Sequence, residues 1–190
     1  MAERAPDDSD RPLIERIADG DKTAFRELFE AYQQPLFRYL TRLVRSPEIA
    51  RELVNDVMFD IWQKAGTFEA RSSVRTWIYR IAHNKAVDHL RRRHEEPWDE
   101  NAAERLTDCG PSPLQAVEQS DLRGLILRLL DALSAEHRAV IQLTYFDGLS
   151  VREIADVIDC PEATVKTRMF YARKQLKALL VEAGIEGAVI

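Results

Sequence analysis

Aromatic and basic side chains alternate between residues 68 and 93, in a pattern suited to contact with nucleic acid. Aromatic rings can stack on unpaired bases while nearby cations neutralise the phosphates of a single strand. An asparagine within the stretch has an amide that could hydrogen-bond the edge of an extruded base. The candidate residues are Phe68, Arg75, Trp77, Arg80, Asn84 and Lys85.

The same residues also have an ordinary structural interpretation. Trp77 shares a helical face with Val74, Ile78 and Ile81, so burial in a hydrophobic core explains it at least as well as base stacking. Asn84 could be a solvated helix residue, and the basic side chains could form a solvated helix face. Both interpretations stay open at the level of sequence.

A second candidate site is the segment from Ser150 to about Leu180, which has the pattern of a helix-turn-helix. Ser150 and Glu153 have the spacing of a capping box, which predicts the start of a short helix. The break at residues 159–161 is followed by a long basic helix from about Glu162. In this motif the second helix enters the major groove of DNA.

The long helix has two distinct faces when it is rotated by 100° per residue. An apolar stripe of Val165, Met169, Ala172, Leu176 and Leu179 is expected to pack inward. The remaining surface mixes hydrogen-bonding, aromatic and basic side chains, which suits base reading with phosphate anchoring. The candidate DNA-binding residues of this segment are Arg152, Thr164, Lys166, Thr167, Arg168, Phe170, Tyr171 and Lys174. A helical hairpin with a merely basic face is the alternative.

No catalytic or metal site is predicted. Asp56 and Asp60 share a helix face at a four-residue spacing, but no third ligand, base or phosphate loop accompanies them. A metal-dependent nuclease is therefore a weak alternative. Cys109 and Cys160 are far apart, and the four histidines lack zinc-ligand spacing. Oxidation of Cys160 in the turn could disturb DNA binding, although an inert small residue is the simpler role for each cysteine.

The charge is strongly segregated along a chain of 190 residues with a net charge of −5. Residues 71–94 hold seven Lys and Arg against one acid, and residues 162–177 hold five against one. Between them, residues 95–121 hold eight acids against one Arg, with three prolines and one glycine. This composition predicts a flexible acidic linker between two domains. We expect an acidic tail over 1–20, domains over 21–94 and 122–182, and a second tail over 183–190.

Apolar residues recur at three- and four-residue spacing in both domains, which predicts an all-α fold. In the first domain we expect helices around residues 25–44, from Pro47 to near Gly66, and from Ser72 or Ser73 onward. Pro35 is expected to kink or break the first of them. Four helices are expected in the second domain. No apolar run approaches the roughly 20 residues of a membrane span, so we expect an intracellular, cytoplasmic protein without membrane insertion.

Three blocks in this order resemble the extracytoplasmic-function (ECF) sigma factors of the sigma-70 superfamily, which are bacterial initiation factors of RNA polymerase. They are ELVNDVMFDIWQK (52–64), SVRTWIYRIAHNKAVDHLRRR (73–93) and GLSVREIADVIDCPEATVKTRMFYARKQL (148–176). The resemblance covers about Asp21 to Leu180. It implies two small helical domains, a region 2-like and a region 4-like one, and no enzymatic activity or cofactor.

The resemblance also implies roles for the candidate residues. The helix over 52–64 looks like the segment that docks on the β′ clamp helices of core polymerase, through Asn55, Asp56, Phe59, Asp60 and Gln63. The set from Phe68 to Lys85 looks like the −10 element site, and the last helix looks like the −35 reader. The β flap is a further expected polymerase contact.

This chain departs from the family pattern at several of these positions. Asn55-Asp56 stands where Gln-Glu is usual, and Met58 where an aromatic residue is usual. In the last helix, Glu162-Ala163 replaces the common Val-Gly, and Tyr171 replaces Arg or His. The individual polymerase contacts and the base preference at −35 are therefore open.

The resemblance further implies control by an anti-sigma factor. We expect the free chain, acidic overall and folded back on its own linker, to bind DNA poorly. The competing interpretation is a stand-alone helix-turn-helix transcription regulator with an N-terminal sensor or dimerisation module. It would leave the aromatic and basic block unexplained.

Overall fold

The computed structural model describes residues 9–95 and 128–182, and over these ranges it contains helices and no strand. The predicted all-α fold is confirmed. The predicted linker and the ends of the chain lie outside the described residues. None of the helices within the described ranges has both the length and the apolar character needed to cross a membrane.

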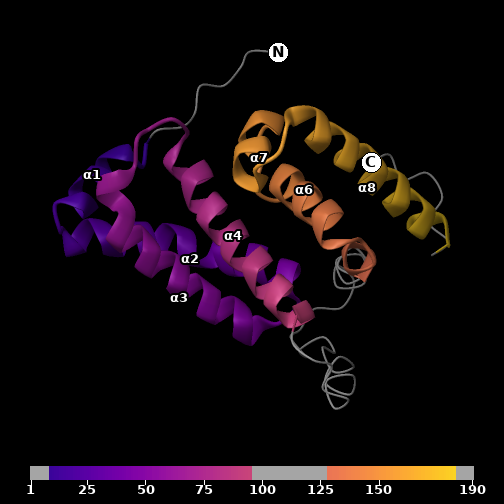
Figure 1. Cartoon of the computed structure of the whole chain (residues 1–190), viewed down its shortest axis with the longest axis horizontal. Helices are drawn as coiled ribbons and strands as arrows, with labels where there is room; N and C mark the ends of the chain where they lie inside the picture. Colours follow the sequence, from indigo (N-terminus) through magenta and orange to yellow (C-terminus); the bar gives the residue numbers. More distant parts are fainter. Residues whose placement is uncertain (1–8, 96–127, 183–190) are drawn as a thin grey trace, which may run out of the picture.

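The first domain is built from α1 (Arg11–Ala18), α2 (Lys22–Val44), α3 (Pro47–Lys64), a short 3₁₀ turn η1 (Ala65–Thr67) and α4 (Val74–Glu95). Helices α2, α3 and α4 pack against one another, and α1 covers one end of α2 and η1 (Figure 1). The helix starts follow from local capping. The Asp21 carboxylate accepts hydrogen bonds from the amides of Thr23 and Ala24, and Ser46 accepts one from Ile49 ahead of Pro47.

Two sequence expectations for this domain were wrong. Residues 1–20 were expected to be a tail, but residues 11–18 form α1, whose Ile14 and Ile17 are buried in the core. Pro35 was expected to kink or break a helix, and it does not break it, because α2 runs through it from residue 22 to residue 44. The buried stripe of Leu28, Leu36 and Leu40 continues on both sides of the proline, so tertiary packing outweighs the local cost of the lost hydrogen bond.

The second domain comprises a helical segment over 128–131, α6 (Ala135–Tyr145), α7 (Val151–Ile158) and α8 (Glu162–Glu182). Ser134 caps α6, and the capping box of Ser150 and Glu153 at the start of α7 is present as predicted. Asp159 ends α7 in the left-handed conformation, at φ 51°. An aspartate tolerates this conformation better than most side chains, so the chain can turn into α8.

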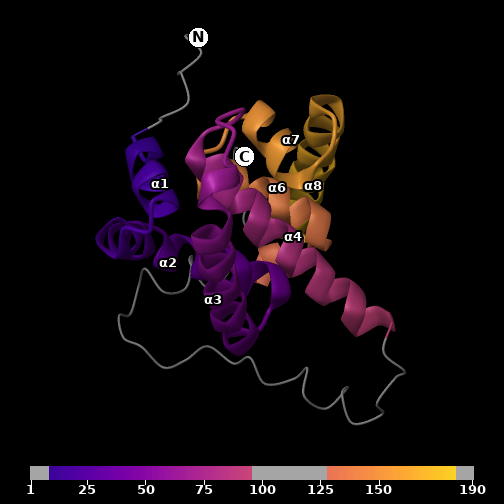
Figure 2. The ribbon, with the colours of Figure 1, turned by 60° about the vertical axis from the view of Figure 1, so that its left-hand side comes forward.

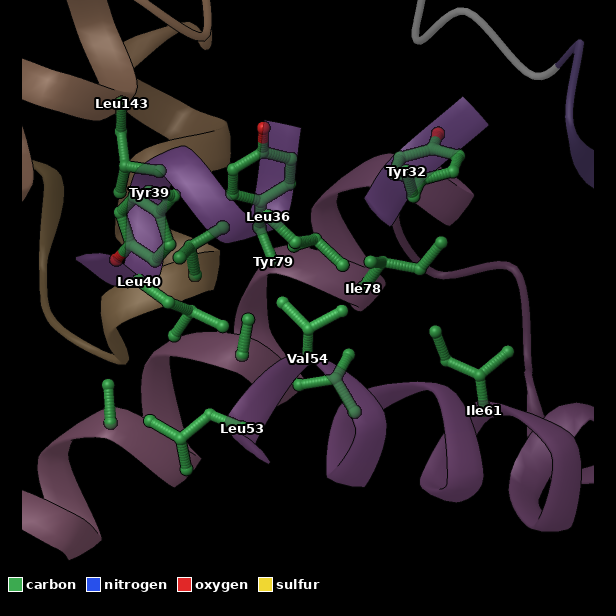
Figure 3. Close-up of a cluster of buried hydrophobic side chains, with 14 of the residues drawn as sticks. Tyr32, Leu36, Tyr39, Leu40, Leu53, Val54, Ile61, Ile78, Tyr79 and Leu143 are labelled. Carbon is green, nitrogen blue, oxygen red and sulfur yellow. The ribbon is translucent and has the colours of Figure 1, made fainter. Parts of the chain in front are cut away.

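The two domains pack directly against each other. Helix α4 lies along α7, and α2 contacts α6 (Figures 1 and 2). One buried hydrophobic cluster runs across the boundary, because Leu143 of α6 reaches Tyr39 and its neighbours in the first domain (Figure 3). A second cluster joins α8 to α6 and residues 129–133. We call this arrangement of the two domains the closed form.

Candidate nucleic-acid interface

The outer face of α3 presents the residues expected to dock on polymerase. Asn55, Asp56, Phe59 and Gln63 are exposed, and the Phe59 side chain is 60% accessible to solvent, although it is a large apolar group. Asp60 is mostly covered and forms ion pairs with Lys64 at 2.8 Å and Lys85 at 3.3 Å. Burial tends to raise the pKa of Asp60, but the hydrogen bonds from the two lysines outweigh it and hold this pKa below its usual value.

Met58 stands where the family usually has an aromatic residue, and it is buried with 2% exposure. Its side chain faces the core beside Val54, Val57 and Ile61. The substitution at this position therefore affects packing inside the domain and leaves the exposed face of α3 unchanged.

The aromatic and basic stretch is divided between the core and the surface. Phe68 and Trp77 contact each other with ring centroids 5.3 Å apart, and both are partly buried against the core. Asn84 is exposed, while Lys85 is partly covered and bound to Asp60. Trp77 is therefore partly packed against the core, and its role in base stacking stays a prediction.

Two arginines of this stretch contact the second domain. Arg75 donates a hydrogen bond to the backbone carbonyl of Asp147, and Arg80 lies 3.6 Å from the carboxylate of Asp159. Tyr79, between them on α4, donates a hydrogen bond to the Asp147 carboxyl group at 2.6 Å. Sequence reasoning missed Tyr79 and Asp147, because no sequence pattern links residues that are 68 positions apart.

The contact between Tyr79 and Asp147 lies in a partly desolvated environment, whereas Arg80 and Asp159 are exposed. Burial raises the pKa of Asp147, while the hydrogen bond from Tyr79 and the charge of Arg75 oppose that rise. Burial and the nearby carboxyl group of Asp147 raise the pKa of the Tyr79 hydroxyl well above its usual value. Tyr79 therefore stays protonated and can act as the donor to Asp147.

A partly buried histidine, His83, lies between Arg80 and Lys85 on α4. The ring nitrogen Nδ1 of His83 is 2.8 Å from the hydroxyl of Tyr39. Burial lowers the pKa of His83 to about 4, with a further contribution from the positive charge of Arg168 on α8. His83 is therefore neutral at pH 7.

The outer face of α8 is as the sequence predicts. Exposed residues of the candidate set are Lys166, Thr167, Phe170, Tyr171 and Lys174, with Arg152 exposed on α7. Phe170 and Tyr171 are 63% and 52% accessible and meet edge to face at 5.4 Å. The buried stripe contains Val165, Met169, Ala172 and Leu176 as expected, but it ends in Leu180, with Leu179 only partly buried.

Several members of the α8 set also make contacts within the protein. The Thr167 hydroxyl donates to the carbonyl of Ala163 at 2.9 Å, and Lys166 pairs with Glu162 at 3.7 Å. Thr164 is half-buried. Arg168 is 26% exposed and pairs with Glu136 of α6 at 3.3 Å. This arginine is therefore positioned at the edge of the reading face.

Cys160 is a free, partly exposed thiol in the turn before α8, and Cys109 lies outside the described residues. Within the described ranges, no group of three or more His, Cys, Asp or Glu side chains is placed to hold a metal ion.

Comparison with known proteins gives one consistent family. Residues 28–96 match the family described as Sigma-70 region 2, and residues 123–176 match Sigma-70, region 4. The chain is 32% identical to the RNA polymerase sigma-H factor of Pseudomonas aeruginosa, over 93% of this chain and 98% of that protein. It is also 32% identical to the ECF RNA polymerase sigma-E factor of Escherichia coli K12, over 88% of this chain and 92% of that one.

Solved structures share the fold. CnrH in complex with the cytosolic domain of CnrY aligns with a TM-score of 0.69 and 24% identity, over 92% of this chain and 99% of that one. The sigma factor RpoE of Bartonella quintana, in complex with the anti-sigma factor NepR, aligns with a TM-score of 0.62 and 25% identity, over 82% and 96% of the two chains.

Proposed function

The chain belongs to the extracytoplasmic-function branch of the sigma-70 family of RNA polymerase sigma factors, and we propose that its exposed faces divide the work of initiation among three sites. As a member of this family it directs transcription initiation and is not an enzyme. Each site corresponds to one exposed face described above.

The exposed face of α3 is the proposed docking site for core polymerase, at the β′ clamp helices. Phe59 supplies an exposed aromatic ring, and Asn55, Asp56 and Gln63 surround it with polar groups. An aromatic anchor within a polar rim is the composition typical of a protein interface. Asp60 forms ion pairs with Lys64 and Lys85. Its proposed role is to position the exposed face of α3, because the pair with Lys85 links α3 to α4.

The proposed −10 site comprises the Phe68 and Trp77 pair together with Arg75, Arg80 and Asn84. The paired rings offer a platform beside an exposed amide, and the arginines can neutralise phosphates of an unpaired strand. Strand opening here needs no catalytic group, because capture of an extruded base stabilises the separated strands.

The proposed −35 site is the outer face of α8. Lys166 and Lys174 can contact phosphates while Phe170 and Tyr171 offer apolar contacts to base edges or sugars. Arg152 on α7 lies near the backbone in this type of docking. Tyr171 stands where Arg or His is usual, so the base preference at −35 is expected to differ from that of relatives with a cation there.

The observation that carries this division is that exposed candidate residues lie on three separate helices of one closed chain. The buried sides of α3, α4 and α8 carry the core, whereas Phe59, Asn84 and Lys166 lie on their exposed sides. A stand-alone DNA-binding regulator would need only the face of α8.

We also propose that an anti-sigma factor controls this protein, acting in the cytoplasm, and that the β flap of polymerase contacts the second domain. The support is the likeness to RpoE of Bartonella quintana, which was solved with its anti-sigma factor NepR. Co-purification of a bound protein with this chain from the source organism would identify the partner. The experiment is repeated with Asp56→Arg.

A reconstituted transcription assay tests the division of work. Purified chain and core polymerase are placed on a pooled promoter library, and both transcripts and permanganate-reactive open complexes are scored. We expect specific starts that require the chain, with reactive thymines near −10. Binding to duplex DNA alone, without core-dependent starts, would overturn the proposal.

A further inference from the structure

A shared carboxylate joins the helix proposed to dock on polymerase to the helix proposed to bind the −10 strand. The Asp60 Oδ2 atom on α3 lies 2.8 Å from the Lys64 ammonium on the same helix and 3.3 Å from the Lys85 ammonium on α4. Lys64 follows Asp60 by four residues, the spacing and order in which an acid and a base pair well on a helix. This pair fixes the orientation of the Asp60 side chain, so that the same oxygen also binds Lys85.

The pair between Asp60 and Lys85 is largely shielded from water. The Asp60 and Lys85 side chains are 20% and 25% exposed, whereas the Lys64 side chain is 54% exposed. Salt ions screen a partly buried pair less than an exposed one. Lys64 therefore exchanges its partner for solvent more readily, and Lys85 is the lysine that stays bound to Asp60.

Lys85 and Asn84 are neighbours in sequence but lie on different sides of α4, because successive helix residues are rotated by about 100°. Asn84 is exposed, and Arg80, four residues earlier, shares its side of the helix. Lys85 follows the fully buried Ala82 by three residues and reaches Asp60 on α3. A phosphate bound at Lys85 would therefore lie toward α3, away from the side that carries Arg80 and Asn84.

The pairing reduces the number of cations that the basic stretch offers to DNA. A lysine compensated by a partly buried carboxylate adds little to phosphate binding, because its existing ion pair must first be broken. The low pKa of Asp60 keeps it ionised at pH 7, so its own charge repels a strand that approaches between α3 and α4. Both effects direct a single strand to the side of Arg80 and Asn84.

We propose that Asp60 is a positioning residue of the −10 site, which acts through Lys85. It keeps the Lys85 ammonium on the α3 side of α4 and withholds it from phosphates, so that a bound strand follows the side of α4 that carries Asn84. This inference rests on the proposed role of α4 in −10 recognition. It assigns Lys85, a candidate DNA contact by sequence, to the support of that site.

The first test measures the affinity of the free full-length chain for a short fluorescein-labelled single-stranded DNA of mixed sequence, by fluorescence anisotropy over a series of salt concentrations. Asp60→Asn removes the charge with little change of shape and should release Lys85. We expect the affinity at low salt to rise about threefold or more. The log–log salt slope should steepen by about 0.7, the value for one added phosphate contact on a single strand. Glu52→Gln, an equal loss of charge on the exposed side of α3, is the matched control.

Two double variants show which lysine is responsible for the gain. The gain from Asp60→Asn should disappear when Lys85→Ala is also present and persist when Lys64→Ala is present, because Lys64 lies on α3 and outside the −10 helix. Asp60→Glu retains the charge and should restore the weaker binding. The proposal would be overturned by an equal gain in Glu52→Gln or in Asp60→Glu, by no gain in Asp60→Asn, or by a gain that survives Lys85→Ala or requires Lys64.

Chemical labelling of lysine amines provides a measurement that needs no variant. The unmodified chain is treated briefly with an acylating reagent, with and without a saturating amount of the same DNA, and modification at Lys85 is quantified by mass spectrometry. We expect DNA to leave the modification of Lys85 unchanged in this chain and to reduce it in Asp60→Asn. Protection of Lys85 by DNA in the unmodified chain would overturn the proposal, even if Asp60→Asn failed to fold.

Initiation at saturating core polymerase tests the consequence for −10 recognition. Permanganate-reactive open complexes are scored on a promoter of the selected sequence and on the same promoter with a substituted −10 element, and the ratio between the two cancels any change in core binding. We expect Asp60→Asn to lower this ratio by about threefold or more, since a phosphate contact at Lys85 does not depend on the base. An unchanged ratio would overturn the role of Asp60 in the −10 site. Failure of the unmodified chain to initiate on any promoter would instead overturn the proposed function, and the measurements on the free chain decide separately whether Asp60 withholds Lys85.

Discussion

The guanidinium of Arg138 in the second domain donates a hydrogen bond to the backbone carbonyl of Arg42 in the first, with Nη1 and O 2.8 Å apart. The same side chain donates to the carbonyls of Leu130, Asp131 and Leu133 at 2.8 to 3.2 Å. It is 2% exposed. The buried guanidinium of Arg138 thus satisfies carbonyl groups at the end of the helical segment over 128–131. It also links the end of this segment to the C-terminal turn of α2.

Replacing Arg138 should destabilise the second domain and loosen the closed form. Burial lowers the pKa of Arg138 to about 10, so it is charged at pH 7 and donates four hydrogen bonds to carbonyls. We expect Arg138→Met to lower the free energy of unfolding by about 2–4 kcal/mol, because several buried carbonyls lose their donor. Urea unfolding measures this change. The exposed Arg173→Met on α8 is the control, and an equal loss there would contradict the prediction.

Acid should destabilise the protein through His83. Its pKa is about 4 in the folded protein and about 6.5 when unfolded, so the unfolded chain binds more protons between these values. The stability contributed by neutral His83 is complete above pH 6.5 and is lost as the pH falls toward 4. The difference amounts to about 3 kcal/mol.

The pH dependence is measured by urea unfolding at a series of pH values in the unmodified chain and in His83→Gln. The variant should show a shallower loss of stability between pH 6.5 and pH 4. His89→Gln, the same change on the same helix, serves as the control. Parallel curves for His83→Gln and the unmodified chain would exclude His83 as the group responsible.

Much of the local structure could be predicted from sequence because it depends on neighbouring residues. The Ser46 and Ser150 caps and the inward stripe of α8 follow from propensity and periodicity alone. Pro35 misled the prediction because its cost is local, whereas the packing of α2 on four other helices is not. Helix α1 was missed because its short apolar pattern lies in an acidic segment.

The exposed sites were easier to locate than the interface that covers part of them. Asn84, Phe59 and Lys166 are found on exposed surfaces, since each lies opposite an apolar stripe that the sequence already contains. The pairing of Arg75 with Asp147 has no such signal in the sequence. It depends on how the two domains pack against each other, and the two residues are far apart in the chain. Charge counting indicated the two basic stretches but not their partners.

Reversing the charge at Asp56 should abolish binding to core polymerase. The residue is exposed beside Phe59 on the proposed docking face, so an arginine there introduces like-charge repulsion or a steric clash without disturbing the fold. We expect Asp56→Arg to lose association with core in size-exclusion chromatography. Glu30→Arg, an equal charge reversal on the exposed side of α2, should bind core normally, and loss of binding in both variants would indicate a general charge effect.

Truncating Lys166 should weaken −35-dependent initiation and leave core binding intact. The lysine is exposed on the outer face of α8 and its ion pair with Glu162 is solvent-exposed, so little stability is lost. Loss of one phosphate contact should reduce the salt dependence of promoter binding by about one unit of log–log slope. Lys177→Ala, further along α8, is the control, and identical salt slopes for both variants would contradict the assignment.

Removing the Asn84 amide should impair −10 recognition without unfolding the first domain. Asn84 is exposed in the middle of α4, so Asn84→Ala should change the free energy of unfolding by less than about 0.5 kcal/mol. If its amide reads an extruded base, open-complex formation should fall by about fivefold or more, the equivalent of one lost hydrogen bond. Permanganate reactivity on a promoter of the selected sequence measures that fall. Val87→Ala, an exposed neighbour on the same helix, should retain full reactivity; if Asn84→Ala instead unfolds the domain and shows no specific promoter defect, the assignment of Asn84 is wrong.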